Sequence, residues 1–378
     1  MRVVFLTHNY PSRPGDPSGI ALATLARALV RRGISVRVVT LSDESGPAEV
    51  EGIPIHRVRA GGSIRQTVSS SDTMAAALRS PVGWLRLARL RRSLRTAVRH
   101  EITAGADLIH AHGWVPAGLA APTGVPLVLT VHGGDARLLK ASRVARSLAR
   151  PLFQRTAVVT AVSREIATLV QTGAGRFVDN AHIHPMPADT RGYPWTRGGA
   201  GLVVISRLVD SKRVELAIET AAVLASCGHD FPLTIVGDGP DRASLEQRAA
   251  RLGVSSLVRF VGSMTLPESR VYLERADIML FTARGDATAW SAIEALVSGV
   301  PVVACWDSGA AVDIVPESGP GRLTLPSAEA LADSVLDLQA DPDRLLMGRL
   351  VGESWRARLA PDNVAELCEG WYRDAMRQ

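Results

Sequence analysis

The sequence predicts an α/β protein with two doubly wound parallel-sheet domains, each of the Rossmann-like kind. Short runs rich in Val, Ile and Leu alternate with longer segments of helical periodicity, a pattern typical of parallel strands joined by right-handed crossovers. The alternation occurs in two series, separated near 189–200 by a segment in which Gly, Pro and polar residues concentrate. A chain of 378 residues is long enough for two such domains.

Strands are expected in both series. The first series spans 2–8, 35–41, 54–59, 107–112, 126–132 and 157–162, and the second spans 201–206, 232–237, 257–262, 277–282, 300–305 and 321–325. Helical periodicity is clearest over 21–32, 214–226 and 242–252. Because ligands of doubly wound sheets bind beyond the carboxyl ends of the strands, two facing sheets are expected to form a central cleft.

The composition narrows the class of protein. Hydrophobic residues make up 46% and charged residues 21%, the balance of a soluble globular protein. The net charge of +6 comes almost entirely from Arg, because the only lysines are Lys140 and Lys212. This bias looks like a coding preference, so we predict no nucleic-acid partner. The excess of positive charge is still compatible with an anionic substrate or a membrane surface.

The cysteines and the N-terminal residues indicate in which cellular compartment the protein is expected. Three cysteines with no paired spacing argue against a disulfide framework or a zinc site, and we expect buried thiols in a reducing compartment. The apolar start "MRVVFL" is too short for a signal peptide, and no apolar run reaches membrane-spanning length. A cytoplasmic location is therefore expected.

The stretch 284–304 places two carboxylates around an expected helix start. Thr288 is the expected N-cap, so that the helix begins near Ala289 and Trp290, and Gly299 ends it. The free N–H groups at such a start suit a phosphate. Asp286 precedes this start, and Glu294 shares a helix face with Ser291. The alternative is a loop carboxylate and a surface ion pair, which the stretch taken alone favours.

Other segments offer groups that suit phosphate. Arg207 and Lys212 follow the first strand of the second series, where doubly wound sheets bind anions, although a solvated basic loop is the alternative. Gly237 opens the Gly-rich turn "GDGP", a weak signal because no third glycine completes a dinucleotide fingerprint. Gly19 lies at a helix start after the first strand, where its backbone can approach a phosphate.

Together these motifs resemble the family-four retaining glycosyltransferases of the GT-B fold. The order and spacing of the basic loop, the "GDGP" turn, the two acids eight residues apart and the strand "GVPVVA" carry the resemblance. The segments "THNYPSRPGDPSG", "DLIHAH", "LTVHGGD" and "RFVGSM" also look like motifs of the family, so that the resemblance extends over almost the whole chain.

The resemblance implies a role for each domain. Residues 1–193 would bind the acceptor, residues 194–361 would bind the nucleotide-sugar donor, and a C-terminal helix over 362–378 would pack back on the first domain. The donor is expected to be UDP-linked. No cofactor is expected, and no metal is required where Arg and Lys neutralise the diphosphate. The oligomeric state stays open.

The resemblance also implies individual roles. Gly19 would meet the donor phosphate, Arg207 and Lys212 would neutralise the diphosphate, Glu294 would hold the ribose and Asp286 would touch the sugar. His132 would lie beside the reacting centre, with Asp135 in the acceptor region. These residues form the catalytic set His132, Arg207, Lys212 and Asp286, the acceptor set His132 and Asp135, and the donor set Gly19, Arg207, Lys212, Gly237, Val261, Ala289, Trp290, Ser291 and Glu294.

Several positions depart from the family pattern. Asp286 stands where the family usually has Glu, and the next residues read "ATAW" instead of starting with "GFG". Ser206 and Arg213 replace glycines that flank the basic loop, and the junction turn reads "MPAD". These changes leave the scaffold intact and alter residues that would contact the donor sugar, so the resemblance does not define which sugar is transferred.

Metal motifs are weak. The "DPD" at 341–343 is interpreted as helix capping. His110 and His112 face one side of a strand, but no third ligand pattern supports a metal there. The Arg-rich segment 83–100 predicts a helix packed on the sheet with a solvated basic face, with a membrane-surface helix as the alternative. The small, polar segment 60–81 before it is interpreted as a loop over the acceptor.

The predicted function is retaining transfer of a sugar from a nucleotide donor to a hydroxyl of a small saccharide or natural product. As the resemblance implies, the acceptor attacks from the face of the leaving group, and a donor phosphate oxygen takes its proton. Alternatives are transfer to a lipid-linked glycan at a peripheral membrane contact, a non-catalytic nucleotide-sugar-binding subunit, and a nucleotide-sugar epimerase. A nicotinamide dehydrogenase is disfavoured by the missing third glycine.

Overall fold

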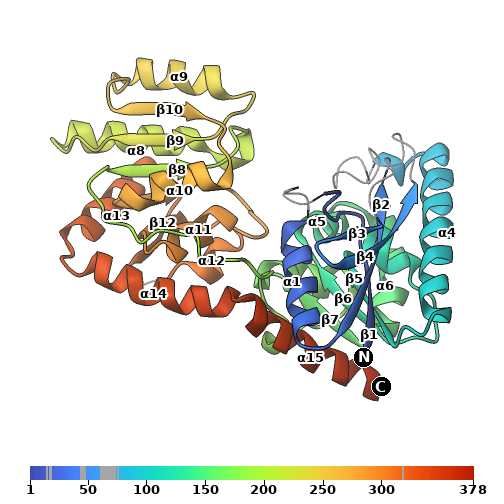
Figure 1. The fold of residues 1–378 in the computed structure, drawn as a ribbon. Helices are drawn as coiled ribbons and strands as arrows, with labels where there is room; N and C mark the ends of the chain where they lie inside the picture. Colours follow the sequence, from blue (N-terminus) through green and yellow to red (C-terminus); the bar gives the residue numbers. More distant parts are fainter. Residues whose placement is uncertain (14–15, 17–18, 43–47, 60–73, 75, 317–318) are drawn as a thin grey trace. The chain divides into compact units, whose positions relative to one another are not determined.

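The computed structural model describes the chain except for residues 14–15, 17–18, 43–47, 60–73, 75 and 317–318. Most of the segment interpreted above as an acceptor loop therefore lies outside the described residues. Contacts divide the chain into unit 1, Met1–Asp189 with Leu359–Gln378, and unit 2, Thr190–Arg358 (Figure 1). The expected domain edge at 193/194 differs from this division, because Tyr193 makes its side-chain contacts within unit 2.

Unit 1 is built on a seven-stranded sheet in the order β3-β4-β2-β1-β5-β6-β7. Its strands are β1 Arg2–Leu6, β2 Ser35–Ser42, β3 Glu49–Val50, β4 Ile53–Arg59, β5 Leu108–His112, β6 Leu127–Val131 and β7 Val158–Ala161. Every pairing is parallel except that of β3 with β4. The central strands are buried along their whole length, as expected for a parallel sheet covered on both faces.

Helices cover the sheet of unit 1. They are α1 Ile20–Arg31, α4 Pro81–Thr103, α5 Gly133–Ala141, α6 Arg143–Arg155, α7 Arg164–Ala174 and α15 Pro361–Arg377, with short turns at Trp114–Gly118 and Asn180–His182. In α4, Ser80 caps the start by accepting a hydrogen bond from the Gly83 N–H at 3.4 Å. Leu90, Leu94 and Val98 are buried where α4 contacts β2 and β4. The interpretation of this segment as a helix packed on the sheet is therefore confirmed.

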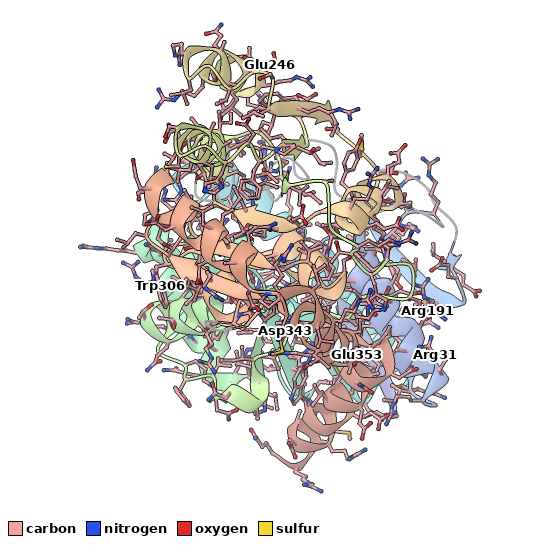
Figure 2. The ribbon with its side chains drawn as sticks, turned by 90° about the vertical axis from the view of Figure 1, so that its left-hand side faces the viewer. Arg31, Arg191, Glu246, Trp306, Asp343 and Glu353 are labelled. Atoms are coloured by element: carbon pink, nitrogen blue, oxygen red, sulfur yellow. The ribbon has the colours of Figure 1, made fainter. Side chains whose placement is uncertain are left out.

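Helix α15 contributes to the core of unit 1 although it follows unit 2 in the sequence. Its apolar face, which includes Val364, Cys368 and Tyr372, packs in one cluster with α1 and the central strands. Arg31 projects from α1 (Figure 2), and its guanidinium lies 2.7 Å from the Asp362 carboxylate at the start of α15. The Tyr372 hydroxyl is hydrogen-bonded to His110 Nδ1 at 2.8 Å.

Unit 2 is built on a six-stranded, wholly parallel sheet in the order β10-β9-β8-β11-β12-β13. Its strands are β8 Leu202–Ile205, β9 Leu233–Val236, β10 Val258–Gly262, β11 Ile278–Phe281, β12 Val302–Cys305 and β13 Gly321–Thr324. Its helices are α8 Val214–Ser226, α9 Arg242–Arg251, α10 Leu266–Arg275, α11 Trp290–Val297, α12 Ala311–Ile314, α13 Ala328–Ala340 and α14 Arg344–Leu359. The twelve predicted strands all occur in the predicted order along the chain, and the short β3 is an additional strand that was not predicted.

Two further expectations concern the thiols and the membrane. All three cysteines are free, and Cys305 and Cys368 are buried, but Cys227 is exposed because it caps the C-terminal end of α8 at the surface. Within the described ranges, none of the helices combines the length and the apolar character needed to cross a membrane.

Candidate functional site

The predicted residues fall in both units, and each group is described within its own unit. In unit 2, the order of the sheet reverses between β8 and β11, which are neighbours although they lie far apart in the sequence. Ligands of doubly wound sheets bind where the strand order reverses in this way. Lys212 lies in the loop after β8, and Asp286 lies in the loop after β11. The sheet therefore brings these two predicted residues together at its switch point.

Lys212 and Asp286 form an ion pair between Nζ and Oδ2. The other carboxylate oxygen, Oδ1, accepts hydrogen bonds from the N–H groups of Thr288 at 3.1 Å and Ala289 at 2.9 Å. Burial alone would raise the pKa of Asp286. Lys212 and the two backbone donors outweigh burial, so that the pKa lies below its usual value. Asp286 is therefore an ionised group that fixes both the basic loop and the approach to α11.

The start of α11 differs from the prediction. Thr288 is not the N-cap. The cap position belongs to Ala289, which has a left-handed φ of 47° and no side-chain hydrogen bond, and Asp286 holds the preceding turn instead. The helix begins at Trp290, so that its first N–H groups and its positive dipole end face the loop after β11. Gly299 follows the helix with a φ of 72°, as predicted for a terminating glycine.

Glu294 is a buried carboxylate, so the alternative interpretation as a surface ion pair is wrong. Only 6% of the residue is exposed, and its Oε1 accepts a hydrogen bond from the Tyr193 hydroxyl at 2.7 Å. Burial raises its pKa, although Tyr193, the charge of Arg270 and the Trp290 side chain act in the opposite direction. The guanidinium of Arg270 stacks on the Tyr193 ring at 3.8 Å.

Tyr193 and Arg270 support Glu294 but were not predicted from the sequence. Tyr193 lies 101 residues from Glu294 and comes from the segment that was interpreted as a linker. Arg270 lies in the middle of α10, where nothing in the pattern distinguishes it from a solvated helix residue. A single polar aromatic in a Gly- and Pro-rich segment is the one available signal.

Arg213 is a third cation of the basic loop, and the sequence predicted no role for it in the site. Arg213 adopts a left-handed φ of 46°, at the position where the resemblance to the family implied a glycine. Its guanidinium binds Asp307 through two N–H groups, at 2.8 and 2.5 Å, and donates from Nε to the Thr282 carbonyl at 2.8 Å. These contacts hold the strained backbone in place. Arg207 is exposed, and the structure records no hydrogen bond or ion pair for its side chain within the described part of the chain.

Gly237 and Val261 lie where β9 and β10 end. A Cβ atom on Gly237 would stand 1.8 Å from the Ser206 carbonyl oxygen, so the close approach of the two loops requires glycine. Val261 lies in a bulge, because the register passes from Phe260 opposite Ile235 to Gly262 opposite Val236. Both residues therefore lie at the carboxyl edge of the sheet, with the loops that contain Lys212 and Asp286.

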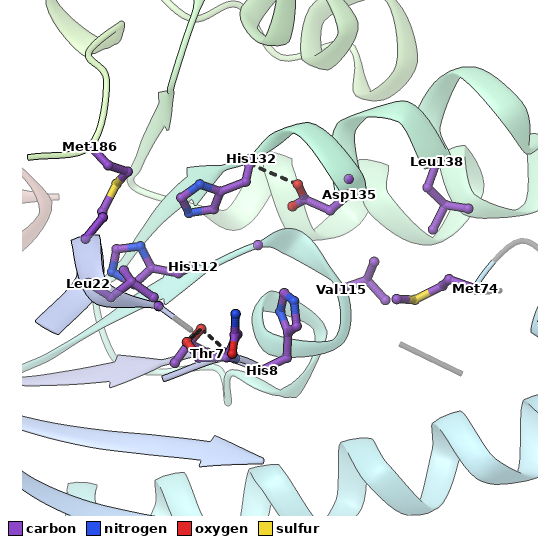
Figure 3. A pocket seen from close by; sticks show the side chains of 15 residues that line it. Thr7, His8, Leu22, Met74, His112, Val115, His132, Asp135, Leu138 and Met186 are labelled. Atoms are coloured by element: carbon purple, nitrogen blue, oxygen red, sulfur yellow. Dashed lines mark hydrogen bonds between the residues drawn. The ribbon is translucent and has the colours of Figure 1, made fainter. Parts of the chain in front are cut away.

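In unit 1, Gly19, His132 and Asp135 line one cavity of about 310 Å³ (Figure 3). The cavity lies beyond the carboxyl ends of β1, β5 and β6, which include the point where the order of this sheet reverses. The other wall residues are Thr7, His8 and Asn9 after β1, Leu22 in α1, His112 at the end of β5, Val115 in the turn after it, Leu138 in α5, and Met74 and Met186 from two further segments.

Three histidines give this cavity its polar character. The buried ring nitrogens His8 Nδ1, His112 Nδ1, His112 Nε2 and His132 Nε2 have no hydrogen-bond partner among the residues that the structure describes. Burial lowers the pKa of all three imidazoles, that of His132 to about 4. They are therefore neutral at physiological pH. Neither His8 nor His112 was predicted as a site residue.

Asp135 is held by backbone N–H groups. It lies in the first turn of α5, where its Oδ1 accepts from the His132 N–H at 3.0 Å and its Oδ2 accepts from the Trp114 N–H at 2.7 Å. Burial raises its pKa to about 7 against the opposing effect of these donors. The carboxylate thus orients the His132 backbone and the turn after β5.

Two more predicted features are settled by local contacts. Gly19 has a φ of 72°, and a Cβ atom there would stand 2.9 Å from the Asn9 carbonyl oxygen, so the turn before α1 requires glycine. His110 faces the same side as His112, but its nitrogens contact the Tyr372 hydroxyl at 2.8 Å and the Thr130 hydroxyl at 2.7 Å. These contacts remove His110 as a metal ligand.

Comparison with protein families identifies the class. Residues 19–190 match the model described as Glycosyltransferase Family 4, and residues 194–348 match the model described as Glycosyl transferases group 1. The two matches together span most of the chain. The protein belongs to family 4 of the glycosyltransferases and has the GT-B fold.

Individual relatives are similar over much of their length. The 2-deoxystreptamine glucosyltransferase of Streptomyces kanamyceticus is 27% identical over 373 residues, which cover 89% of this chain and 93% of that protein. The GDP-mannose-dependent α-(1-6)-phosphatidylinositol monomannoside mannosyltransferase of Mycolicibacterium smegmatis is 26% identical over 67% of this chain and 75% of its own.

Solved structures show the same fold. Sucrose-phosphate synthase from Thermosynechococcus elongatus superimposes with a TM-score of 0.75 at 18% identity, over 100% of both chains. HepE from Anabaena in complex with UDP gives a TM-score of 0.66 at 18% identity, over 99% of this chain and 100% of that chain. At these identities the likeness concerns the fold alone.

Proposed function

We propose that the protein is a retaining glycosyltransferase that moves a sugar from a nucleotide sugar to a hydroxyl of a small saccharide or natural-product acceptor. The observation that carries the proposal is the ion pair of Lys212 with Asp286, at the point where the sheet of unit 2 reverses its strand order and α11 begins. A cation, a helix N-terminus and a carboxylate are there grouped as a sugar diphosphate requires.

Unit 2 is proposed to bind the donor. Lys212 and the exposed Arg207 supply positive charge for the diphosphate, together with the first N–H groups of α11 at Trp290 and Ser291. Glu294, whose Oε1 accepts a hydrogen bond from Tyr193, is proposed to bind the ribose hydroxyls. Gly237 and Val261 belong to the strand ends where the base would lie. HepE was crystallised with UDP, which supports a UDP sugar as the first donor to test.

The proposed reaction proceeds on one face of the sugar. The acceptor hydroxyl oxygen forms a bond to the anomeric carbon, while the bond from that carbon to the diphosphate oxygen breaks. The acceptor proton passes to the departing phosphate oxygen, so that no protein base is needed. Because Arg207 and Lys212 neutralise the developing charge, the reaction is proposed to need no metal.

Unit 1 is proposed to bind the acceptor in the cavity lined by His132. Neutral imidazoles with unpartnered nitrogens accept or donate hydrogen bonds, and they therefore suit the hydroxyls of a compact polar ring. A relative of similar length is named for 2-deoxystreptamine, a small cyclic acceptor. This likeness supports a soluble saccharide or natural-product acceptor.

A lipid-linked acceptor is the second candidate, and one observation favours it. The first turns of α4 expose Val82, Trp84 and Leu85, and the helix continues with exposed Arg residues. Such a surface suits an anionic membrane. The mannosyltransferase relative is named for a phosphatidylinositol monomannoside. Activity that depends on vesicles would favour this candidate.

Calorimetry in excess chelator tests the donor site. Purified protein is titrated with UDP-, GDP- and dTDP-sugars, and the tightest binder is repeated with Arg207→Ala and Glu294→Ala. Binding that both substitutions weaken supports the site. No binding by any donor to folded protein contradicts it.

Turnover then separates the enzyme from a non-catalytic binding subunit. An acceptor panel is incubated with the preferred donor, and the anomeric configuration of the product is read by NMR. Retention supports the proposed mechanism. An altered sugar formed without any acceptor would instead indicate an epimerase.

A further inference from the structure

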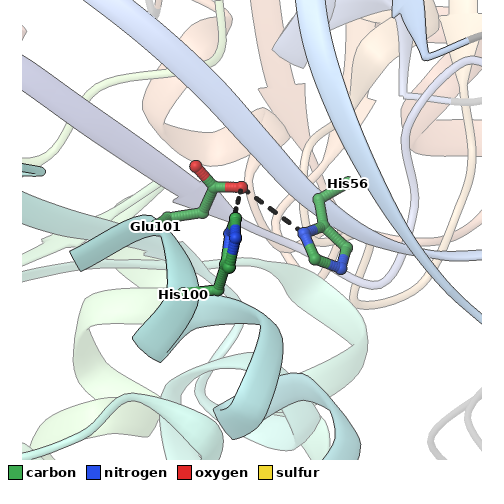
Figure 4. Close-up of side chains that lie close together, drawn as sticks. All are labelled: His56, His100 and Glu101. Carbon is green, nitrogen blue, oxygen red and sulfur yellow. Dashed lines mark hydrogen bonds and ion pairs between the residues drawn. The ribbon is translucent and has the colours of Figure 1, made fainter. Parts of the chain in front are cut away.

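A cluster of two histidines and a glutamate joins α4 to β4 in unit 1. His56 comes from β4, and His100 and Glu101 come from the last turns of α4 (Figure 4). His56 Nδ1 lies 3.4 Å from Glu101 Oε1, and His100 Nδ1 lies 3.8 Å from the same oxygen. Two ring nitrogens therefore converge on one carboxylate oxygen.

The position of Glu101 is electrostatically unfavourable without positive partners. Only 1% of its side chain is exposed, and it lies near the C-terminal end of α4, where the helix dipole is negative. Arg37 on β2 supplies one partner, because its Nε lies 2.6 Å from Oε2. The remaining oxygen, Oε1, faces the two imidazoles.

The geometry is close to that of a divalent metal site. All three potential ligand atoms lie within 4.8 Å of one another. A tetrahedral zinc ion with bonds of about 2.0–2.1 Å places its ligand atoms roughly 3.3 Å apart. The two separations from Glu101 Oε1 are near this value. The His100 side chain is 72% exposed, so its ring has room to rotate toward the other two ligands.

We propose that His56, His100 and Glu101 bind a zinc ion, with water in the fourth position. Two imidazoles and one carboxylate are a ligand set that zinc uses. Arg37, bound to the second carboxylate oxygen, orients Glu101 from outside the coordination sphere. The ion cross-links α4 to β4. None of these residues belongs to the proposed donor or acceptor site, so the inference is independent of the transfer reaction.

No motif in the sequence indicates this site. His56 lies 45 residues from Glu101, and adjacent residues such as His100 and Glu101 do not share a helix face. The fold places them together because the C-terminal half of α4 packs against β4. Within the described residues, this is the group of His, Cys and acidic side chains with metal-binding spacing.

Zinc titration of metal-free, tag-free protein at pH 7.5 tests the site. The parent for all variants is Cys227→Ser, because the exposed thiol of Cys227 offers zinc a competing ligand. Calorimetry with zinc chloride should give one ion per chain. His100→Ala should weaken the affinity by more than about 100-fold, since losing even an outer partner of a metal ligand typically costs about 10- to 100-fold.

Two further variants complete the design. Glu101→Gln keeps the shape of the side chain and should abolish stoichiometric binding. His229→Ala removes an exposed histidine from unit 2 and should leave the affinity unchanged. Zinc should raise the thermal unfolding midpoint of the parent, and chelator should reverse the rise. The absence of binding to the parent, or binding that His100→Ala leaves intact, would overturn the proposal.

Discussion

Lys212 and Asp286 are ion-paired in unit 2 although they are 74 residues apart, because β8 and β11 lie side by side. The cation proposed to neutralise a diphosphate is thus held by the acid proposed to contact the sugar. Both groups are partly buried, with side-chain exposures of 20% and 16%. The pair therefore influences donor binding and turnover in different ways.

From this ion pair we predict that Asp286→Asn changes the affinity for the nucleoside diphosphate product and the rate of transfer in opposite directions. Removing the carboxylate charge leaves Lys212 available to the diphosphate, so the affinity for free nucleoside diphosphate should rise by roughly 3- to 10-fold. Transfer should fall, because the contact with the sugar is lost. Lys212→Gln should weaken nucleotide binding by about 10- to 100-fold, as expected for a lost charged hydrogen bond. Calorimetry with UDP and an initial-rate assay measure both effects; weaker UDP binding by Asp286→Asn would refute the first.

Because Tyr193 donates a hydrogen bond to Glu294, we predict that removing the Tyr193 hydroxyl destabilises unit 2. Tyr193→Phe leaves a buried carboxylate oxygen without its donor, which typically costs about 1–3 kcal/mol of unfolding free energy. Urea unfolding measures the change. Tyr272→Phe, in α10 of the same unit, is the matched control and should alter stability by less than about 0.5 kcal/mol. Equal effects of both substitutions would mean that the hydrogen bond contributes little.

We predict that adding a single methyl group at Gly237 strongly lowers the free energy of unfolding. Gly237→Ala places Cβ 1.8 Å from the Ser206 carbonyl oxygen, so the loops after β8 and β9 must separate. We expect a loss of about 3 kcal/mol or more and a matching loss of nucleotide affinity. Gly370→Ala, in α15 with open space around its Cβ, should instead stabilise the protein by about 0.5–1 kcal/mol. Chemical denaturation of both variants makes the comparison.

The buried histidines predict that unit 1 loses stability in acid. His8, His110, His112 and His132 have pKa values below the unfolded value of 6.5, so the folded state resists protonation. Each contributes stability that is present above pH 6.5 and is lost as the pH falls toward about 4. Asp135, with its pKa raised to about 7, acts oppositely over the same window. Four groups against one should make the unfolding free energy fall on acidification.

Urea midpoints between pH 7 and pH 4 test this expectation. Each histidine changes the slope by at most about 1.4 kcal/mol per pH unit. His112→Leu should flatten the slope by up to that amount, since the variant has no imidazole to protonate at this position. A slope that is unchanged in His112→Leu would contradict the lowered pKa, because it would mean that the His112 imidazole titrates alike in the folded and unfolded states.

The order of strands and helices was predictable because hydrophobic periodicity and the residue types that form turns can be seen in short stretches of sequence. Helix α8 begins and ends where its periodicity indicated, at Val214 and Ser226. The two-residue strand β3 was missed because it is too short to show alternation. Thr288 was predicted as the cap of α11, but the cap is Ala289, and Asp286, three positions before Ala289, satisfies the turn. A side chain that reaches along the chain is not visible in a capping pattern.

The candidate site was predictable only where a motif is contiguous. The Lys212 and Asp286 loops carry recognisable motifs, and the sheet brings them together. Tyr193 and Arg270 support Glu294 from separate segments, so only the fold shows their proximity. Arg213 looked like a lost glycine, yet it keeps the left-handed backbone and compensates through Asp307. In such cases tertiary contacts override the local preference.

The placement of α15 determines the order in which the chain can mature on the ribosome. Residues 190–358 emerge before 361–377, so unit 2 has its complete sequence while unit 1 still lacks a helix. Until then, the faces of α1 and β5 that meet Cys368 and Tyr372 have no covering, and His110 has no tyrosine partner. Unit 1 therefore cannot complete its core until the whole of unit 2 has been synthesised. Translation that stops before Pro361 leaves an apolar surface for chaperones and proteases to recognise.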